Sequence, residues 1–178
     1  MAPLTRVCLI GPESTGKSEL AKRLARHFNA AWVPEFARQY AEERNNQLSF
    51  DDCEPIARGQ IALESGGMAA ALQILDTDLI STVVYARHYY GKCPSWIVDE
   101  ARKRRAGLYL LMDTDVPWIA DEARDTGAEG REDLFDAFRA ALDEFDCCWV
   151  IISGDWEERF EGAVAAITAN RQPTTDNG

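Results

Sequence analysis

Eight residues near the N-terminus limit the possible folds more than any other segment: they form the loop Gly-Pro-Glu-Ser-Thr-Gly-Lys-Ser at positions 11–18. A short apolar run, residues 6–10, precedes the loop, and a segment with apolar residues at every fourth position follows it. The loop matches the pattern G-x-x-x-x-G-K-[ST] in the order of strand, loop and helix that a phosphate-binding loop requires. A chance loop with glycines is the alternative interpretation, but it does not predict this order. We therefore expect the chain to bind a nucleotide by its phosphates.

Each part of the loop has a predicted task. The glycines let the backbone curl so that successive N–H groups point at phosphate oxygens, beside the positive end of the helix dipole. The nucleotide-binding residues predicted in the loop are Gly11, Glu13, Ser14, Thr15, Gly16, Lys17 and Ser18. Lys17 is expected to reach the β- and γ-phosphates of ATP, and Ser18 to offer its hydroxyl to Mg²⁺. Asp76 ends a later apolar run and is expected to make the second contact with magnesium.

Apolar runs typical of strands alternate with helical patterns along most of the chain. This alternation predicts a three-layer α/β fold of the P-loop NTPase type, with a five-stranded parallel sheet and the first strand near its centre. The expected strands are residues 6–10, 30–33, 72–75, 108–112 and 148–152, and helices are expected after the loop, from residue 35, over 49–63, 79–90 and 94–105, and along the apolar stripes of 134–145 and 160–167. The polar stretch 121–131 contains two glycines, so we expect a mobile loop there that could act as a lid.

The length of 178 residues suits one domain, which we place at residues 1–171, followed by a disordered polar tail at 172–178. Five cysteines without a C-x-x-C pair favour reduced thiols, and no apolar run approaches the roughly 18 residues of a membrane span. The protein is therefore expected in the cytoplasm and off the membrane. A net charge of −11 makes nucleic acid an unsuitable partner, because it repels a phosphate backbone. The sequence predicts no particular oligomeric state.

Two features of the sequence argue against some of the functions for which proteins bind a nucleotide. Asp76 is followed by Thr77 and not by the glutamate that often polarises water in hydrolytic motors. The chain also lacks an N-K-x-D segment for guanine recognition, which argues against a standard GTPase switch. A small kinase is the simplest interpretation.

The chain also resembles a known family over nearly its whole length. The matching segments are Gly11–Ser18, Pro34–Arg38, Asp76–Asp78 with Thr82, Tyr90–Pro94, Asp115–Trp118 leading to Arg124 and Arg131, and Gly154–Phe160. They are similar to the nicotinamide riboside kinase domain of NadR-type NAD biosynthesis proteins, which are related to nucleoside kinases. The resemblance implies a nucleoside-kinase-like fold and phosphorylation of the 5′-hydroxyl of nicotinamide riboside with Mg-ATP. Because no H-x-G-H motif is found, we expect the activity to stop at the kinase step.

Four residues are predicted to hold the acceptor. Glu35 and Arg38 follow the second expected strand, at the carboxyl edge where α/β sheets bind ligands. They could hold the ribose or remove the hydroxyl proton, or they could form only a surface pair at a helix start. Asp76 and Asp78 end the third strand, and a turn there could aim both into the site. One of them would orient the substrate, whereas a helix cap is the alternative for Asp78. Glu35 or Asp76 is the predicted base.

Two arginines and one tryptophan complete the predicted site. Arg124 and Arg131 flank the glycine-bearing stretch, and their guanidinium groups could stabilise the transferring phosphoryl group, as in kinase lids. The alternative is a solvated loop. Trp156 follows the fifth strand, where related folds place the adenine. Two other functions stay open: a kinase for another nucleoside or small alcohol, and a binding switch that closes on ATP or GTP without catalysis.

Overall fold

One parallel sheet with the strand order β2-β3-β1-β4-β5 organises the chain. Its structure is a computed structural model that describes residues 5–66, 70–116 and 127–171. The strands are β1 (Arg6–Ile10), β2 (Ala31–Val33), β3 (Gln73–Asp76), β4 (Leu108–Met112) and β5 (Trp149–Ile152). The helices are α1 (Lys17–Phe28), α2 (Phe36–Glu42), the short 3₁₀ turn η1 (Phe50–Asp52), α3 (Cys53–Gly66), α4 (Leu79–Tyr90), α5 (Ser95–Lys103), α6 (Gly127–Glu144) and α7 (Trp156–Arg171).

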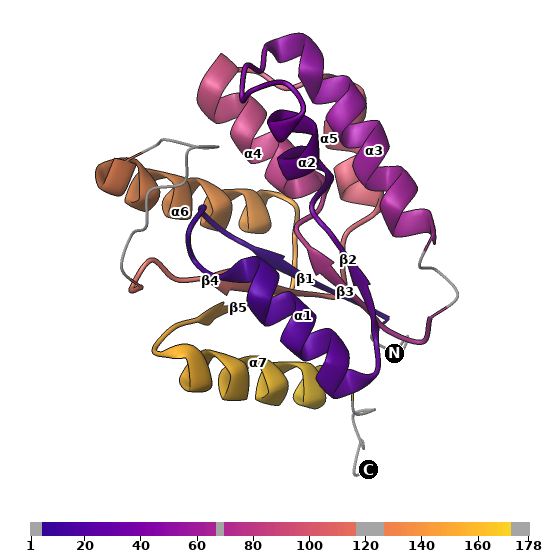
Figure 1. Cartoon of the computed structure of the whole chain (residues 1–178), viewed down its shortest axis with the longest axis vertical. Coiled ribbons are helices and arrows are strands. Elements are labelled where there is room, and N and C mark those ends of the chain that lie inside the picture. Colours follow the sequence, from indigo (N-terminus) through magenta and orange to yellow (C-terminus); the bar gives the residue numbers. More distant parts are fainter. Residues whose placement is uncertain (1–4, 67–69, 117–126, 172–178) are drawn as a thin grey trace.

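Helices cover both faces of the sheet, which makes the three expected layers (Figure 1). Successive side chains of β1 point to opposite faces, and both faces are buried. Val7 and Leu9 pack with residues of α1 and α7, whereas Cys8 and Ile10 pack with residues of α3, α4, α5 and α6. The predicted five-stranded α/β fold with a central first strand is therefore confirmed.

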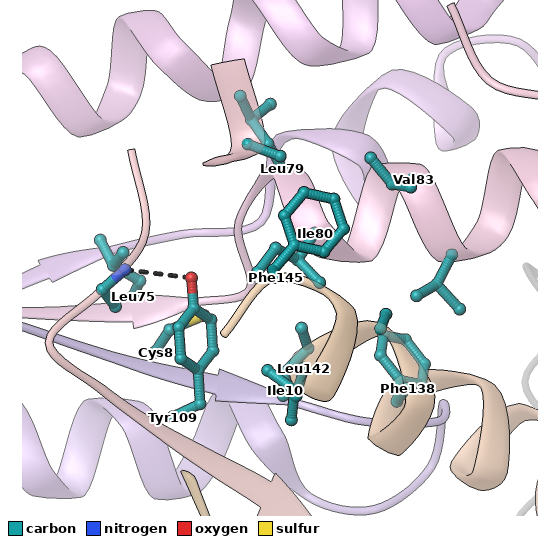
Figure 2. Packing of buried hydrophobic residues seen from close by; sticks show 14 of the residues in the cluster. Cys8, Ile10, Leu75, Leu79, Ile80, Val83, Tyr109, Phe138, Leu142 and Phe145 are labelled. Atoms are coloured by element: carbon teal, nitrogen blue, oxygen red, sulfur yellow. Dashed lines mark hydrogen bonds between the residues drawn. The ribbon is translucent and has the colours of Figure 1, made fainter. Parts of the chain in front are cut away.

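Large aromatic side chains fill the space between the sheet and α6. Phe138, Leu142 and Phe145 are fully buried on the predicted apolar stripe of α6 (Figure 2). Tyr109 of β4 lies among the same residues, and its hydroxyl accepts a hydrogen bond from the Ala106 backbone amide at 3.0 Å, the dashed line of Figure 2. A polar hydroxyl is thus present inside this core, and the Ala106 amide gives it a hydrogen-bond partner.

The expected elements agree with the structure except at some ends. Strands 6–10 and 108–112 and helix 79–90 are confirmed to the residue. The expected helix at 49–63 begins as a 3₁₀ turn, where the side chains of Ser49 and Asp52 form a capping box. The helix expected at 94–105 ends at Lys103. In the described chain, no helix is both long and apolar enough to cross a membrane.

The prediction of a loop at 121–131 is wrong for residues 127–131, because α6 begins at Gly127. A glycine in a helix costs only about 1 kcal/mol relative to alanine, so the packing of the apolar stripe behind it can outweigh the turn signal. The start of the helix is also tied down, since Arg131 is 3% exposed and donates to two backbone carbonyls after β4. Arg124 and the predicted tail 172–178 lie outside the described residues.

Candidate functional site

The phosphate loop connects the end of β1 to the start of α1 at the carboxyl edge of the sheet (Figure 1). Two of its glycines have conformations that other residues rarely adopt, with φ of 138° at Gly11 and 80° at Gly16. A Cβ atom on Gly11 would lie 3.0 Å from the Met112 carbonyl oxygen of β4. The loop therefore needs glycine there both for its turn and for its close approach to the neighbouring strand.

The side chain of Lys17 points back toward the first residues of the phosphate loop. Its Nζ donates to the backbone carbonyls of Gly11 at 2.9 Å and Pro12 at 2.5 Å, and the residue is 9% exposed. The hydroxyl of Thr15 also donates to the Pro12 carbonyl, at 2.8 Å. The amine thus lies inside the curl of the loop, where the sequence places the phosphates.

Ser18 and Asp76 meet across 58 positions of sequence, as the magnesium prediction requires. The Ser18 hydroxyl donates to Asp76 Oδ2 at 2.5 Å, and Asp76 is 2% exposed at the end of β3. A hydroxyl and one carboxylate beside a phosphate loop are the protein ligands that Mg²⁺ commonly uses, with phosphates and waters completing its shell. These residues fit the predicted ion.

A strained residue separates the two predicted aspartates. Thr77 has φ of 73°, which is rare for a β-branched residue, and its backbone N–H donates to the Leu9 carbonyl of β1. Asp76 before it faces Ser18. Asp78 after it caps α4, accepting from the Ile80 N–H at 2.9 Å and from the Tyr109 hydroxyl at 2.6 Å. The turn therefore gives the two carboxylates different surroundings.

Asp78 is buried, and burial raises the pKa of its carboxyl to about 6, with the negative charge of Glu64 adding to the rise. The hydrogen bonds from Tyr109 and Ile80 act in the opposite direction. Both of its oxygens are engaged by the fold, which is the helix-cap role left open by the sequence. Asp78 nevertheless lines the cavity described next, so its charge can still act on a ligand.

A cavity of about 320 Å³ opens beside the carboxyl edge, between α2, α3 and α4. Its wall contains Glu35, Asn46, Ser49, Cys53, Gln60, Thr77, Asp78, Thr82, Tyr85, Tyr89 and Tyr90, with apolar residues between them. Glu35 takes the N-cap position of α2, as expected for a residue just after a strand. Arg38 is not in the wall: its side chain is 52% exposed and pairs with Glu42 of the same helix at 3.4 Å. Its predicted role in holding the acceptor is therefore not supported by its position.

Gln60 of α3 is a cavity residue that the sequence interpretation missed. It is 2% exposed, and its Oε1 accepts from the Phe36 backbone N–H at 3.0 Å. That bond orients the amide, and its Nε2 has no hydrogen-bond partner in the described structure. A buried donor without a partner costs free energy, about 1–3 kcal/mol, which a ligand oxygen could recover. Only its buried place on a helix distinguishes this glutamine, and no sequence motif surrounds it.

Arg159 is a second residue that was missed, although it lies in the matching segment 154–160. It is fully buried, and its guanidinium group donates to the carbonyls of Thr15, Asp113 and Gly154 and to the Asp115 carboxylate. One side chain therefore holds the phosphate loop to the loops after β4 and β5. A turn of helix earlier, Trp156 lies so close to the loop that a Cβ on Gly16 would be 2.3 Å from its Cη2.

Of the two predicted lid arginines, only Arg131 lies within the described residues. Arg131 is buried and donates to the carbonyls of Thr114 at 2.8 Å and Val116 at 3.0 Å. In this conformation it fastens the segment after β4 to α6, because backbone carbonyls give a buried guanidinium group the hydrogen-bond partners it needs. The predicted contact of Arg131 with the transferring phosphoryl group stays a prediction.

Comparisons with known proteins agree with this arrangement. A profile of an AAA domain family matches residues 6–159. The "Trifunctional NAD biosynthesis/regulator protein NadR" of Escherichia coli (strain K12) is 26% identical over 169 residues, which are 90% of this chain and 41% of that protein. Its counterpart in Salmonella typhimurium is 28% identical over 128 residues, 68% of this chain and 31% of that protein. The chain thus spans less than half the length of these curated relatives.

Solved structures show the same likeness. A NadR protein in complex with NR covers 94% of this chain at 27% identity, with a TM-score of 0.72 and 51% of that chain aligned. A NadR protein in complex with NAD and AMP-PNP covers 98% at 27% identity, with a TM-score of 0.74 and again 51% of that chain. Deoxyadenosine kinase from M. mycoides, at 10% identity, covers 93% of this chain and 100% of its own, with a TM-score of 0.66.

The last likeness concerns the fold alone, and it confirms the prediction of a nucleoside-kinase-like architecture. The two NadR structures and the curated relatives confirm the predicted resemblance to NadR-type proteins. Because the family profile runs from the first residue of β1 to the buried Arg159 that closes the site, this chain belongs to that AAA domain family.

Proposed function

We propose that this chain transfers the γ-phosphoryl group of ATP to the 5′-hydroxyl of nicotinamide riboside, which gives nicotinamide mononucleotide. The observation that carries the proposal is the place of the 320 Å³ cavity: Tyr85 in its wall donates to Glu13 of the phosphate loop at 2.8 Å. A ligand in the cavity would therefore lie beside the loop that holds the transferred group. The NadR structures with NR and with AMP-PNP support a riboside as acceptor and ATP as donor.

In this proposal the phosphate loop supplies most of the catalysis, since phosphoryl transfer depends mainly on positioning and charge neutralisation. The amine of Lys17 releases the carbonyls of Gly11 and Pro12 and donates to oxygens of the β- and γ-phosphates instead. Ser18 would hold Mg²⁺ directly and Asp76 through water, and the ion would neutralise charge on the phosphoryl oxygens. Trp156, over the end of the loop, would contact the adenine.

Glu35 is the better placed of the two candidate bases. It lines the cavity, whereas Oδ2 of Asp76 accepts the hydrogen bond from Ser18. We therefore assign Glu35 to accept the proton of the 5′-hydroxyl and Asp76 to the magnesium side. Gln60 offers its amide N–H to an oxygen of the acceptor. Arg124 remains the proposed lid arginine.

The cavity wall suits an acceptor with a positive ring. Glu35 and Asp78 contribute carboxylates to the wall. Tyr85 and Tyr89 contribute stacked aromatic rings, whose centroids lie 6.0 Å apart at an interplanar angle of 10°. Aromatic faces and carboxylates both attract cations. Nicotinamide riboside is positively charged, so the cavity should favour it over neutral nucleosides.

The proposal covers residues 1–171 as the kinase domain and places the reaction in the cytoplasm. The five cysteines support that location, because all are free thiols.

A panel of nucleosides with Mg-ATP, read by mass spectrometry, tests the proposal. Nicotinamide riboside should be converted to its mononucleotide far faster than adenosine, cytidine and uridine, and Lys17→Ala should remove this activity. A faster reaction with another nucleoside would overturn the substrate assignment. If ATP binds tightly and no riboside is phosphorylated, the chain is a nucleotide-dependent switch instead.

A further inference from the structure

The hydrogen bond between Tyr85 and Glu13 spans 72 positions of sequence. Glu13 is 4% exposed, inside a loop whose task is to hold phosphate anions. A buried carboxylate beside phosphates is electrostatically unfavourable unless donors hold it in place. The phenolic hydroxyl of Tyr85 is such a donor, and a hydrogen bond to an ionised group is about twice as strong as one between neutral groups. This contact therefore fixes the orientation of the loop carboxylate.

The ring of Tyr85 is itself held by its neighbours. Tyr89 stacks on its face, and Phe138 of α6 meets it edge-on with centroids 5.7 Å apart at 80°. The same ring forms part of the wall of the cavity. A ligand that fills the cavity therefore contacts the residue whose hydroxyl reaches the phosphate loop.

We propose that Tyr85 and Glu13 form a positioning pair that couples an occupied acceptor cavity to the phosphate loop. The acceptor packs against the ring of Tyr85 and keeps its hydroxyl on the Glu13 carboxylate. The carboxylate in turn holds the backbone between Gly11 and Gly16 in the conformation that puts the γ-phosphate in line with the acceptor hydroxyl. Neither residue transfers a proton. The proposal rests on the kinase function proposed above.

Tyr85→Phe is the matching variant, because it keeps the ring in the cavity wall and removes only the hydroxyl. With the nucleoside that the wild-type protein phosphorylates fastest, kcat should fall about tenfold while the KM for that nucleoside changes less than about threefold. Glu13→Ala should lower kcat to a similar degree. The double variant should be no slower than the slower single one, since both substitutions remove the same contact.

Tyr40→Phe is the matched control. The Tyr40 hydroxyl also donates to a carboxylate at 2.8 Å, that of Asp52, but Tyr40 lies outside the cavity wall and the phosphate loop. Its loss should lower the melting temperature about as much as Tyr85→Phe does and leave kcat unchanged.

The coupling is refuted if Tyr85→Phe and Tyr40→Phe have the same effect on kcat, or if the effects of Tyr85→Phe and Glu13→Ala multiply in the double variant. It is also refuted if Tyr85→Phe raises only the KM for the nucleoside, which would make Tyr85 a simple wall residue. In each of these cases the wild-type protein is an active kinase and the proposed function stands. A wild-type protein that phosphorylates no nucleoside overturns the proposed function and the pair together.

Discussion

Asp78 should make the stability of the protein depend on pH in an unusual direction. Burial raises the pKa of its carboxyl from 3.8 to about 6. The folded state therefore binds more protons than the unfolded state between these values, and Asp78 lowers stability as pH rises through them. The shift is 6 − 3.8, about 2 pKa units, or on the order of 3 kcal/mol at pH 7, most of it developing between pH 4 and pH 7.

The variant Asp78→Asn removes this titration and keeps an oxygen for the Ile80 N–H. Its free energy of unfolding, minus that of the wild type, should rise by roughly 2 kcal/mol between pH 4 and pH 7. Urea denaturation of both proteins at several pH values measures the difference and cancels the other titrating groups. A difference that stays constant within about 0.5 kcal/mol would contradict this prediction, because it would show that Asp78 titrates with an ordinary pKa.

Asp52→Asn gives the opposite sign and serves as the control. The Ser49 backbone N–H, with smaller contributions from the hydroxyls of Tyr40 and Ser49, lowers the pKa of the Asp52 carboxyl. Its stabilisation is therefore present above the unfolded pKa and is lost as pH falls through the folded one. The variant should be less stable than the wild type at pH 7, and this deficit should shrink in acid.

Three further predictions concern single side chains. Lys17→Ala should abolish turnover in a protein that still folds and unfolds cooperatively, whereas the surface variant Lys22→Ala should keep full activity in the same assay. Asp76→Asn should lose most activity and need more magnesium for half-maximal rate, because the substitution removes the carboxylate beside Ser18; an unchanged magnesium titration would contradict this. Glu64→Gln should destabilise the protein by about 3 kcal/mol in urea denaturation, since Glu64 is 1% exposed between two arginine side chains that would be left without their counter-charge.

The local signals in the sequence were sufficient for the elements of the fold. The apolar run at 108–112 and the helical pattern at 79–90 match the strand and helix to the residue. They do so because strand and helix periods are short-range properties, and because Gly91, with φ of 69°, stops α4 at a recognisable position. The start of α6 was misplaced, since glycines at 127 and 130 signal a turn and only the packing behind them makes a helix.

Side-chain roles were harder to predict than elements. Ser18 and Asp76 could be paired from the sequence because a phosphate loop and a strand end have known places on one edge of a sheet. Gln60 and Arg159 have no such local marker: their importance comes from burial and from hydrogen bonds to distant backbone groups. Arg131 contacts backbone carbonyls of the segment after β4, and its predicted contact with the phosphoryl group stays a prediction.

Residues close together in the chain are enough to predict the phosphate loop, the order of strands and helices, and the resemblance to NadR-type proteins. Which side chains share a space depends instead on the tertiary structure. Tyr85 reaches Glu13 because α4 crosses beside the loop, and Asp76 and Asp78 part because Thr77 turns the backbone between them. Such contacts depend on how distant segments pack, and a local pattern of residues carries no record of that packing.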